Sequence, residues 1–260
     1  MVATLEFSRQ LHTGIVLTAT GVSRCVEIEG YAVLTPLPVI SQIGVGIAFD
    51  VPVVAEACGL GSPGLSEEVE IRVYGRGLSF SNPALPRLLE DVATKAYANN
   101  GEVDFQTVIE VSKPLAGIET VVASLEGSNI VVHNMPIPLY DLGGVWGVIV
   151  KLNKPLNSHK IIENIFTRVG VYEKILLDHI DNIIDGLYLI YQRLGQETMM
   201  TRLNKVIGYN EKLEALGLVI DISGKQVAYL FSDYDDALEA SLRLESEGAV
   251  LEAPLTVLGM

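Results

Sequence analysis

Leu218–Glu247, LVIDISGKQVAYLFSDYDDALEASLRLESE, is the stretch of this chain from which a fold can be predicted most directly. Leu218–Ile222 and Val227–Phe231 are short apolar runs on either side of Gly224, a pattern that predicts a β-hairpin. Asp233 follows the second run and is placed to cap a helix that continues to the end of the stretch. The stretch therefore predicts two antiparallel strands followed by a helix.

The sequence on both sides of this stretch predicts the rest of an α+β unit. Val145–Leu152 and Ala249–Ala253 are predicted strands, which we expect to join the two hairpin strands in one sheet. Apolar residues three and four positions apart predict the intervening helices, which are His159–Arg168 with Ser158 as N-cap, Tyr172–Leu194 and Met199–Leu216. Such a succession is typical of an α+β protein with helices packed on an antiparallel sheet.

The first half of the chain is rich in predicted strands. Apolar and β-branched residues bounded by Gly and Pro mark the segments Thr13–Thr20, Tyr31–Val39, Val69–Tyr74 and Phe105–Val111. One helix is predicted among them, Pro83–Asn99, with its apolar residues on a single stripe. Pro, Asn and Gly residues between His133 and Gly144 predict a boundary. We therefore expect an N-terminal domain over residues 1–143 and a C-terminal domain over residues 144–260.

Composition limits the classes of protein to consider. The chain has 260 residues, of which 49% are hydrophobic and 19% are charged, so it can bury a substantial core. Its apolar runs are too short to cross a bilayer, and its start does not have the pattern of a signal peptide, so we expect a cytoplasmic protein. A net charge of −14 opposes binding to nucleic acid or to an anionic membrane. An anionic substrate would need a local basic cluster.

Two groups of possible metal-binding residues have simpler explanations. Cys25 and Cys58 have no CxxC or Cys/His spacing, so we predict two free buried thiols instead of a zinc site or a disulfide. Asp178, Asp181 and Asp185 are spaced three and four apart and could chelate Mg²⁺ from one face of a helix. A solvated acidic face is the commoner explanation of that pattern in an acidic chain.

The segment Lys113–Val121, KPLAGIETV, is a candidate phosphate site. A strand that ends in a Pro/Gly turn and opens a helix presents N–H groups and the positive end of the helix dipole to an anion, and Gly117 would allow close approach. An ordinary strand-to-helix turn explains the same residues. Glu119 opposes phosphate binding, because at ~5 Å and an effective dielectric of ~20 its charge would repel each phosphate charge by about 3 kcal/mol. Lys113 or a bridging metal would have to compensate.

Two further groups in the first half of the chain could bind an anion. Arg9 offers a bidentate fork for phosphate or carboxylate, and His12 can donate a hydrogen bond or transfer a proton. The Gly44-Val45-Gly46 segment could let a ligand approach the backbone. Without a ligand, the same residues would be a surface arginine, a satisfied histidine and a bulge or tight turn.

These motifs, taken in order, resemble those of the GHMP kinase superfamily, and within it the archaeal β-ribofuranosylaminobenzene phosphate synthases of methanopterin biosynthesis. In that family an early Arg-Leu-His precedes a Gly-Gly-Val-Gly-Ile-Ala stretch, and here Arg9-Gln10-Leu11-His12 precedes IGVGIA at Ile43–Ala48. The family's central Ser-Gly-Ile-Gly loop corresponds to Ala116–Glu119, and the glycine pair after it to Gly127–Ser128. Its late Ser-Ser-Phe-Gly-Pro-Thr-Val segment is similar to Asp221–Val227.

The resemblance implies a two-lobed GHMP-kinase-like α+β fold, with a strand-rich N-terminal lobe and helices packed on an antiparallel sheet in the C-terminal lobe. It implies a transferase that joins the ribose phosphate of phosphoribosyl pyrophosphate to an aromatic acid, with Mg²⁺ and with loss of carbon dioxide and pyrophosphate. An ATP-binding small-molecule kinase is the alternative enzyme. A catalytically silent binding protein is the third alternative, favoured by Ile43, Glu119 and Ser128, which stand where the synthases have glycine.

The resemblance also implies a set of site residues and partners. The residues assigned to phosphate or substrate binding are Arg9, His12, Gly44, Gly46, Lys113, Gly117, Thr120 and Gly224. No catalytic residue and no protein metal ligand can be named. We expect a cleft between the lobes that binds a phosphorylated small molecule, with no nucleic-acid or membrane partner. A homodimer is compatible with the resemblance.

Overall fold

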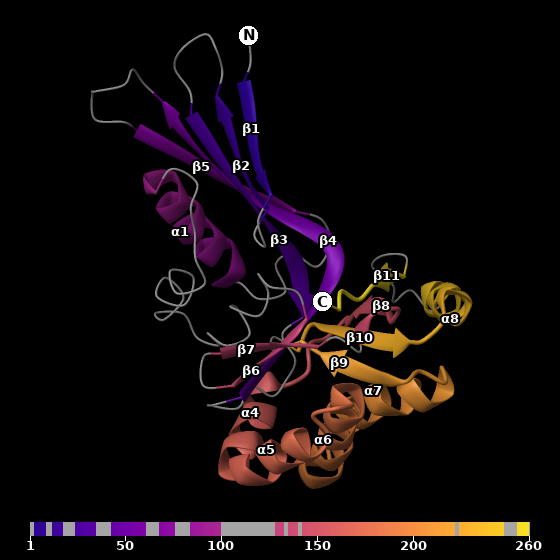
Figure 1. The fold of residues 1–260 in the computed structure, drawn as a ribbon. Coiled ribbons are helices and arrows are strands. Elements are labelled where there is room, and N and C mark those ends of the chain that lie inside the picture. The colour runs from indigo at the N-terminus through magenta and orange to yellow at the C-terminus, as the bar shows by residue number, and fades with distance from the viewer. Residues whose placement is uncertain are drawn as a thin grey trace.

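The computed structural model of the protein describes residues 3–8, 12–17, 24–34, 43–60, 68–75, 84–99, 128–132, 135–139, 142–221, 224–246 and 254–259. These residues form helices and antiparallel sheets in two lobes, one built mainly of strands and the other rich in helices (Figure 1). The predicted α+β class and the two-lobed arrangement are therefore confirmed.

The strand-rich lobe is built on an antiparallel sheet. Its described strands are β1 (Ala3–Ser8), β2 (His12–Leu17), β3 (Arg24–Leu34), β4 (Ile43–Leu60), β5 (Glu68–Gly75), β6 (Asn129–Val132) and β7 (Met135–Pro138). Their order is β1-β2-β3-β4-β6-β7, and β5 also pairs with β4. The strand predicted at Val69–Tyr74 is confirmed as β5, whereas the one predicted at Phe105–Val111 lies outside the described residues.

The strand β3 begins earlier than the sequence predicted. We expected a strand at Tyr31–Val39, but β3 runs from Arg24 to Leu34. Its first half alternates buried Val26 and Ile28 with half-buried Cys25 and Glu27, as a strand with one covered face does. The prediction was based on β-branched content and missed this alternation.

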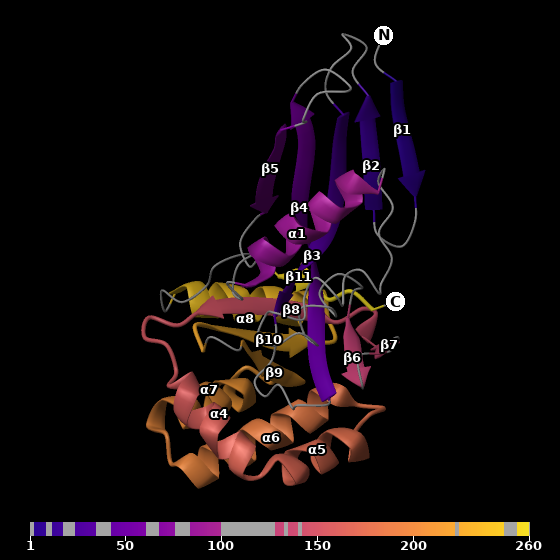
Figure 2. The ribbon, with the colours of Figure 1, turned by 90° about the vertical axis from the view of Figure 1, so that its left-hand side faces the viewer.

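The strand β4 is long enough to serve both lobes. Its first residues, 43–46, pair with β6, residues from Ile47 to Cys58 pair with β3, and its second half also pairs with β5. The register with β3 shifts between Tyr31 and Ala32, whose partners are Pro52 and Phe49. Two residues of β4 are therefore unpaired with β3 at this bulge, where a proline without an N–H group is tolerated. Figures 1 and 2 show β4 bending here and continuing toward the helix-rich lobe.

The helix α1 (Ala84–Ala98) covers one face of the strand-rich sheet (Figure 2). It confirms the helix predicted at Pro83–Asn99. The described part of the predicted stripe is buried, namely Leu89, Val92, Ala93 and Ala96. It packs against the buried side chains of β3 and β4, which are Val26, Ile28, Ala55 and Ala57. The 3.6-residue period of the sequence thus produced the helix face that covers the sheet.

The helix-rich lobe contains the second antiparallel sheet. Its described strands are β8 (Trp146–Lys151), β9 (Gly217–Ile220), β10 (Gln226–Phe231) and β11 (Leu255–Thr256), in the order β11-β8-β10-β9. The predicted pairing of Val145–Leu152, Leu218–Ile222 and Val227–Phe231 in one sheet is confirmed by β8, β9 and β10. The strand predicted at Ala249–Ala253 lies outside the described residues, and β11 occupies the place beside β8.

Five described helices belong to this lobe: α4 (Ser158–Thr167), α5 (Val169–Asp178), α6 (Ile183–Thr198), α7 (Thr201–Lys212) and α8 (Tyr234–Ser246). Asp233 caps α8 as predicted, because its Oδ1 accepts a hydrogen bond of 2.7 Å from Asp235 N–H. The N-cap of α4 is Asn157, which accepts from Lys160 N–H at 3.1 Å, and not Ser158 as predicted. None of the described helices has both the length and the apolar character needed to span a bilayer.

The prediction of a single helix over Tyr172–Leu194 is wrong, because α5 ends at Asp178 and a separate helix, α6, begins at Ile183. Asn182 caps α6 by accepting from Asp185 N–H at 3.4 Å and donating from Nδ2 to Asp185 Oδ2 at 2.6 Å. The break separates Asp178 and Asp181 from Asp185, so the three carboxylates do not share a helix face. They are not among the described groups that could hold a metal ion.

The prediction of free thiols is also wrong. Cys25 of β3 and Cys58 of β4 are directly opposite in register, with Cα atoms 4.1 Å apart, and they form a disulfide. The two residues are 33 positions apart in the sequence. Their pairing depends on the register of two strands, which no local spacing of cysteines could reveal.

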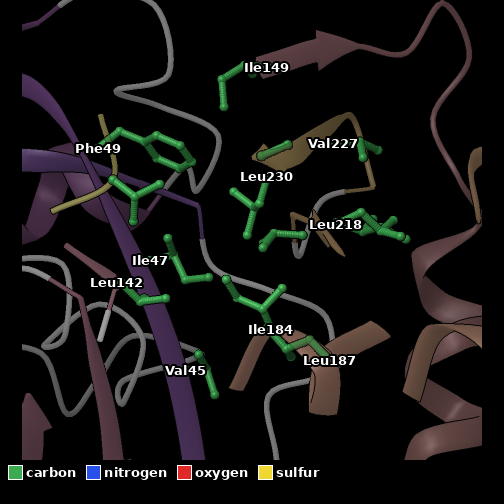
Figure 3. Close-up of a cluster of buried hydrophobic side chains, with 14 of the residues drawn as sticks. Val45, Ile47, Phe49, Leu142, Ile149, Ile184, Leu187, Leu218, Val227 and Leu230 are labelled. Atoms are coloured by element: carbon green, nitrogen blue, oxygen red, sulfur yellow. The ribbon is translucent and has the colours of Figure 1, made fainter. Parts of the chain in front are cut away.

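One hydrophobic core extends through both lobes. Figure 3 shows Val45, Ile47 and Phe49 of β4 pointing toward side chains of α6 and of the second sheet, among them Ile184 and Leu230. The first residues of β4 are thus packed inside the helix-rich lobe. The predicted boundary at residues 143/144 falls between β7 and β8 and remains a prediction.

Candidate functional site

Half of the predicted site residues lie outside the described residues: Arg9, Lys113, Gly117 and Thr120. The backbone of His12 opens β2, opposite Ser8 of β1 and Glu29 of β3, but its side chain is also outside the described part. The geometry of the site is therefore built from Gly44, Gly46 and Gly224, and from their neighbours.

Gly44 and Gly46 belong to the part of β4 that pairs with β6, opposite Val131 and Asn129. Side chains alternate along a strand. Because Val45 and its odd-numbered neighbours point into the inter-lobe core (Figure 3), the two glycines lie on the opposite face of β4. That face carries no side chain at Gly44 and Gly46, which allows close packing against the backbone. Gly46 is itself buried, as is Ala48 on the same face, so the protein already covers this part of the strand.

Ser128 fixes the backbone beside this glycine face. Its side chain is fully buried and its Oγ accepts a hydrogen bond of 3.0 Å from Ala48 N–H. Its carbonyl oxygen accepts from Leu139 N–H, also at 3.0 Å. The position at which the synthases have glycine is thus occupied here by a serine that ties β4 to the β6–β7 hairpin.

Gly224 forms the turn between β9 and β10, with a φ of +67° that L side chains rarely adopt. Its N–H donates to Asp221 O at 2.9 Å, and its carbonyl oxygen accepts from Leu156 N–H at 2.8 Å. A Cβ at this position would lie 2.9 Å from Leu156 O. The turn therefore requires glycine for its own geometry, and contact between Gly224 and a substrate remains a prediction.

Asp221 organises the same turn and was missed by the sequence reasoning. The residue is buried, and its Oδ1 accepts from Lys225 N–H at 2.8 Å and from Gln226 N–H at 3.1 Å. Buried carboxylates require such donors. An aspartate three residues before a turn glycine is the sequence signal that could have identified it.

Gln226 is a second residue that the sequence reasoning missed. Its buried Oε1 has no hydrogen-bond partner among the described residues. In the alternation of β10, Gln226 shares a face with Leu230, which lies opposite Gly147 and points into the inter-lobe core. An unsatisfied buried acceptor is costly, so this oxygen is suited to a hydrogen bond from a ligand or a water molecule.

Tyr191 connects α6 to the strand that precedes this turn. Its hydroxyl accepts from Ile220 N–H at 3.2 Å and donates to Ile220 O at 3.4 Å. Burial raises the pKa of this phenol well above its ordinary value, and the charge of Asp221 raises it further. Tyr191 therefore stays protonated and serves to hold the elements together.

Glu197, at the end of α6, accepts hydrogen bonds from three side chains. Tyr172 donates to its Oε2 at 2.7 Å and Arg193 to its Oε1 at 2.9 Å, and Arg168 also donates to Oε1. Burial raises the pKa of Glu197, but the bonds from Tyr172 and Arg193 and the charges of both arginines outweigh burial and lower the pKa overall. This network joins α4, α5 and α6, and its role is to stabilise the packing of these helices.

The described residues do not supply an evident site for Mg²⁺. The one group of possible ligands found among them is Cys25, Glu56 and Cys58, in which the two cysteines are bonded to each other. Mg²⁺ prefers oxygen ligands and commonly binds through substrate phosphates with one or two carboxylates. The residues predicted to surround the phosphates, Lys113 to Thr120, lie outside the described part of the chain.

Comparisons with known proteins identify the fold. No family model matches the sequence, and no curated protein matches it. Among solved structures, mevalonate kinase from Methanococcus jannaschii is similar with a TM-score of 0.63 and 11% identity, covering 90% of this chain and 98% of that chain. A phosphotransferase related to the CoA biosynthesis pathway is similar with a TM-score of 0.60 and 14% identity, covering 90% and 97%.

Homoserine kinase from Cytophaga hutchinsonii is also similar, with a TM-score of 0.52 and 12% identity over 89% of this chain and 97% of that chain. These structures are GHMP-kinase-fold proteins. The protein therefore has the GHMP kinase fold, and at these identities the likeness establishes the fold alone.

Proposed function

We propose that the protein is a small-molecule transferase of the GHMP superfamily that binds a phosphorylated substrate between its two lobes. The observation that carries this proposal is the extent of the fold, which covers 90% of this chain and nearly all of mevalonate kinase and of a phosphotransferase. The glycines of β4, in the part of the strand that enters the helix-rich lobe, and the unsatisfied Gln226 Oε1, on the sheet face that carries Leu230, support a ligand site on this side of the second sheet.

An ATP-dependent small-molecule kinase is the first candidate reaction. It is supported by the solved structures that the chain resembles, which are named as kinases or phosphotransferases. In this candidate Lys113, Gly117 and Thr120 would hold the nucleotide phosphates, and Mg²⁺ would arrive bound to them. The loop differs from the Pro-x3-Gly-Leu-Gly-Ser-Ser loop of the superfamily kinases because Pro114–Val121 lacks its second glycine and both serines.

Phosphoribosyl transfer of the β-ribofuranosylaminobenzene phosphate synthase type is the second candidate. It is supported by the ordered motifs around Arg9, His12, Gly44 and Gly46. In this candidate phosphoribosyl pyrophosphate and an aromatic acid would be the substrates, as in methanopterin-type cofactor biosynthesis. Arg9 would pair with a phosphate or carboxylate group, for which a guanidinium fork is well suited.

Isothermal titration calorimetry separates the candidates. ATP and phosphoribosyl pyrophosphate are each titrated into the protein with and without Mg²⁺. Selective binding of ATP with Mg²⁺ supports the kinase, and selective binding of phosphoribosyl pyrophosphate supports the synthase-type transferase. If neither ligand binds under any condition, the transferase proposal is wrong and a catalytically silent binding protein becomes the better description.

Two loop variants test the position of the site. Gly117→Val should abolish binding of the selected ligand, because the added side chain would occupy the space over the helix terminus. Glu119→Gly should tighten binding, because it removes a repulsion of about 3 kcal/mol per phosphate charge at close range. If Glu119→Gly leaves both ligands without measurable affinity, the Lys113–Val121 loop is not a phosphate site.

A further inference from the structure

A cavity of about 370 Å³ lies in the helix-rich lobe between α7, α8 and the end of β8. We call it the α7–α8 cavity. Its inner surface is apolar and consists of the buried side chains Val150, Leu156, Val206, Tyr229 and Leu244. The remaining lining residues include four basic ones, Lys151, Lys154, Arg202 and Lys205, and none of the described lining residues is acidic.

The α7–α8 cavity lies on the side of the second sheet that faces away from the inter-lobe core. Gly147 of β8 faces the core, and a Cβ there would meet the ring of Phe49. Val150 is three residues further along the strand and therefore points to the opposite face. Tyr229 points there too, since its hydroxyl donates to the carbonyl oxygen of Val206 in α7 at 3.1 Å. The cavity thus lies on the other face of the second sheet from the inter-lobe core, although Gly224 packs against its lining residue Leu156.

The basic residues of this cavity are unusual in an acidic protein. The chain has 18 Lys and Arg residues against 32 Asp and Glu residues, yet four cations meet here. The ion pairs among the described residues involve Arg72, Arg168 and Arg193, and none includes a cation of the cavity. All four side chains are exposed, and together they give the rim of the cavity a local positive charge that attracts an anion.

The start of α7 adds to this positive potential. Met200, its N-cap, makes no side-chain capping bond, and the first turn of the helix contains no acidic residue. The N-cap and first turn of the helix therefore supply no acidic side chain to offset the positive end of its dipole, and Arg202 of this first turn lines the cavity. On the same helix Lys205 lies 5.7 Å from the centre of the Tyr209 ring, which also lines the cavity.

We propose that the α7–α8 cavity binds a small organic phosphate, with the phosphate among the basic residues and the apolar part of the molecule on the buried surface. A cavity of this size suits a small metabolite. The combination of an apolar interior with a basic rim selects a molecule that has both an anionic and an apolar part. The net charge of −14 disfavours a polyanionic macromolecule as the ligand. This site is independent of the proposed transferase reaction.

Methyl NMR of the full chain tests the proposal with phenyl phosphate and inorganic phosphate as probes. Phenyl phosphate should shift the methyl signals of Val150, Val206 and Leu244 in a saturable manner, and inorganic phosphate should do so about tenfold more weakly because it lacks the apolar part. If these methyl signals do not move at millimolar phenyl phosphate, the cavity is not a ligand site. Equal affinity for both probes would overturn the assignment of an organic phosphate.

A charge-matched pair of variants distinguishes a local site from the overall field of the protein. Arg202→Glu with Lys205→Glu should raise the half-saturation concentration of phenyl phosphate at least about tenfold. Lys95→Glu with Lys174→Glu makes the same change in net charge on α1 and α5, away from the cavity. This control should change the half-saturation concentration by no more than about twofold.

Equal weakening in both double variants would show a field effect and overturn the site. If Arg202→Glu with Lys205→Glu does not fold, Lys154→Glu in the exposed segment after β8 serves in its place, and it should weaken binding severalfold. Unchanged affinity in Lys154→Glu would then contradict the proposal.

Discussion

Gly147 is a residue whose missing side chain makes the junction of the lobes possible. A Cβ on it would overlap the ring of Phe49, which is fully buried. Overpacking a core costs about 1–3 kcal/mol. Gly147→Ala should therefore lower the free energy of unfolding by that amount in urea denaturation, and Phe49→Leu in the same chain should restore part of the loss.

Gly170 provides the control for Gly147. It lies in α5, and a Cβ added to it would have no neighbouring atom within 4 Å, so Gly170→Ala should be neutral or stabilise the protein by up to about 1 kcal/mol. Equal destabilisation by both alanines would contradict the assigned contact with Phe49.

Gly224 tests backbone strain and steric contact together. Gly224→Ala should destabilise the protein by about 2 kcal/mol, because it places a side chain at φ +67° and 2.9 Å from Leu156 O. Gly144→Ala should cost only about 1 kcal/mol, since Gly144 has φ +87° but no neighbour within 4 Å of the added carbon. Thermal melts of both variants would show the difference, and equal melting temperatures would exclude a contribution from Leu156.

Glu197 should make stability depend on acidic pH. Its pKa in the folded protein is lowered, with the opposing effect of burial outweighed by Tyr172, Arg193 and Arg168. A lowered folded pKa stabilises the protein above the unfolded pKa of ~4.3, and this stabilisation is lost as the pH falls through the folded pKa.

The variant Glu197→Gln should consequently be less stable than the native protein by about 1 kcal/mol at pH 7, and the difference should shrink below pH ~4. Urea denaturation across this range measures it. A difference that stays constant with pH would mean that the charge of Glu197 is not responsible.

At the scale of elements, the disulfide between β3 and β4 is the one covalent link among the described strands. The two cysteines are 33 positions apart in the sequence. In the chain-entropy description, closing a loop of this length stabilises the folded protein by about 3–4 kcal/mol. Reduction should therefore lower the midpoint of chemical denaturation. The double variant Cys25→Ser/Cys58→Ser should match the reduced protein and should not respond to a thiol reductant; a midpoint unaffected by reduction would show that the bond is not formed in solution.

At the scale of the whole molecule, the two lobes share one core and should not be independently stable. Residues 144–260 alone lack Val45, Ile47 and Phe49, which fill the space beside α6 and the second sheet (Figure 3). We expect this fragment to melt at a lower temperature than the full chain and to bind a hydrophobic dye, because it exposes an apolar face. A cooperative melt at the temperature of the full chain would instead establish residues 144–260 as an independent domain.

Parts of the candidate site could be predicted and others could not. The turn at Gly224 follows from two apolar runs around a glycine, a pattern contained in a few consecutive residues. The importance of Asp221 and Gln226 depends on which backbone groups and which face of the sheet surround them. That information is created only when β10 pairs with β8 and β9.

The sequence by itself determined the local elements of this protein. Three examples are the buried stripe of α1, the strands β8 to β10 and the Asp233 cap of α8. Each of them is predicted from residues that are close together in the sequence. Tertiary structure alone decided the Cys25–Cys58 bond, the double role of β4 and the meeting of basic residues at the α7–α8 cavity. The reason is that periodicity and capping act between neighbours in the chain, whereas these features join residues that only strand register and helix packing bring together.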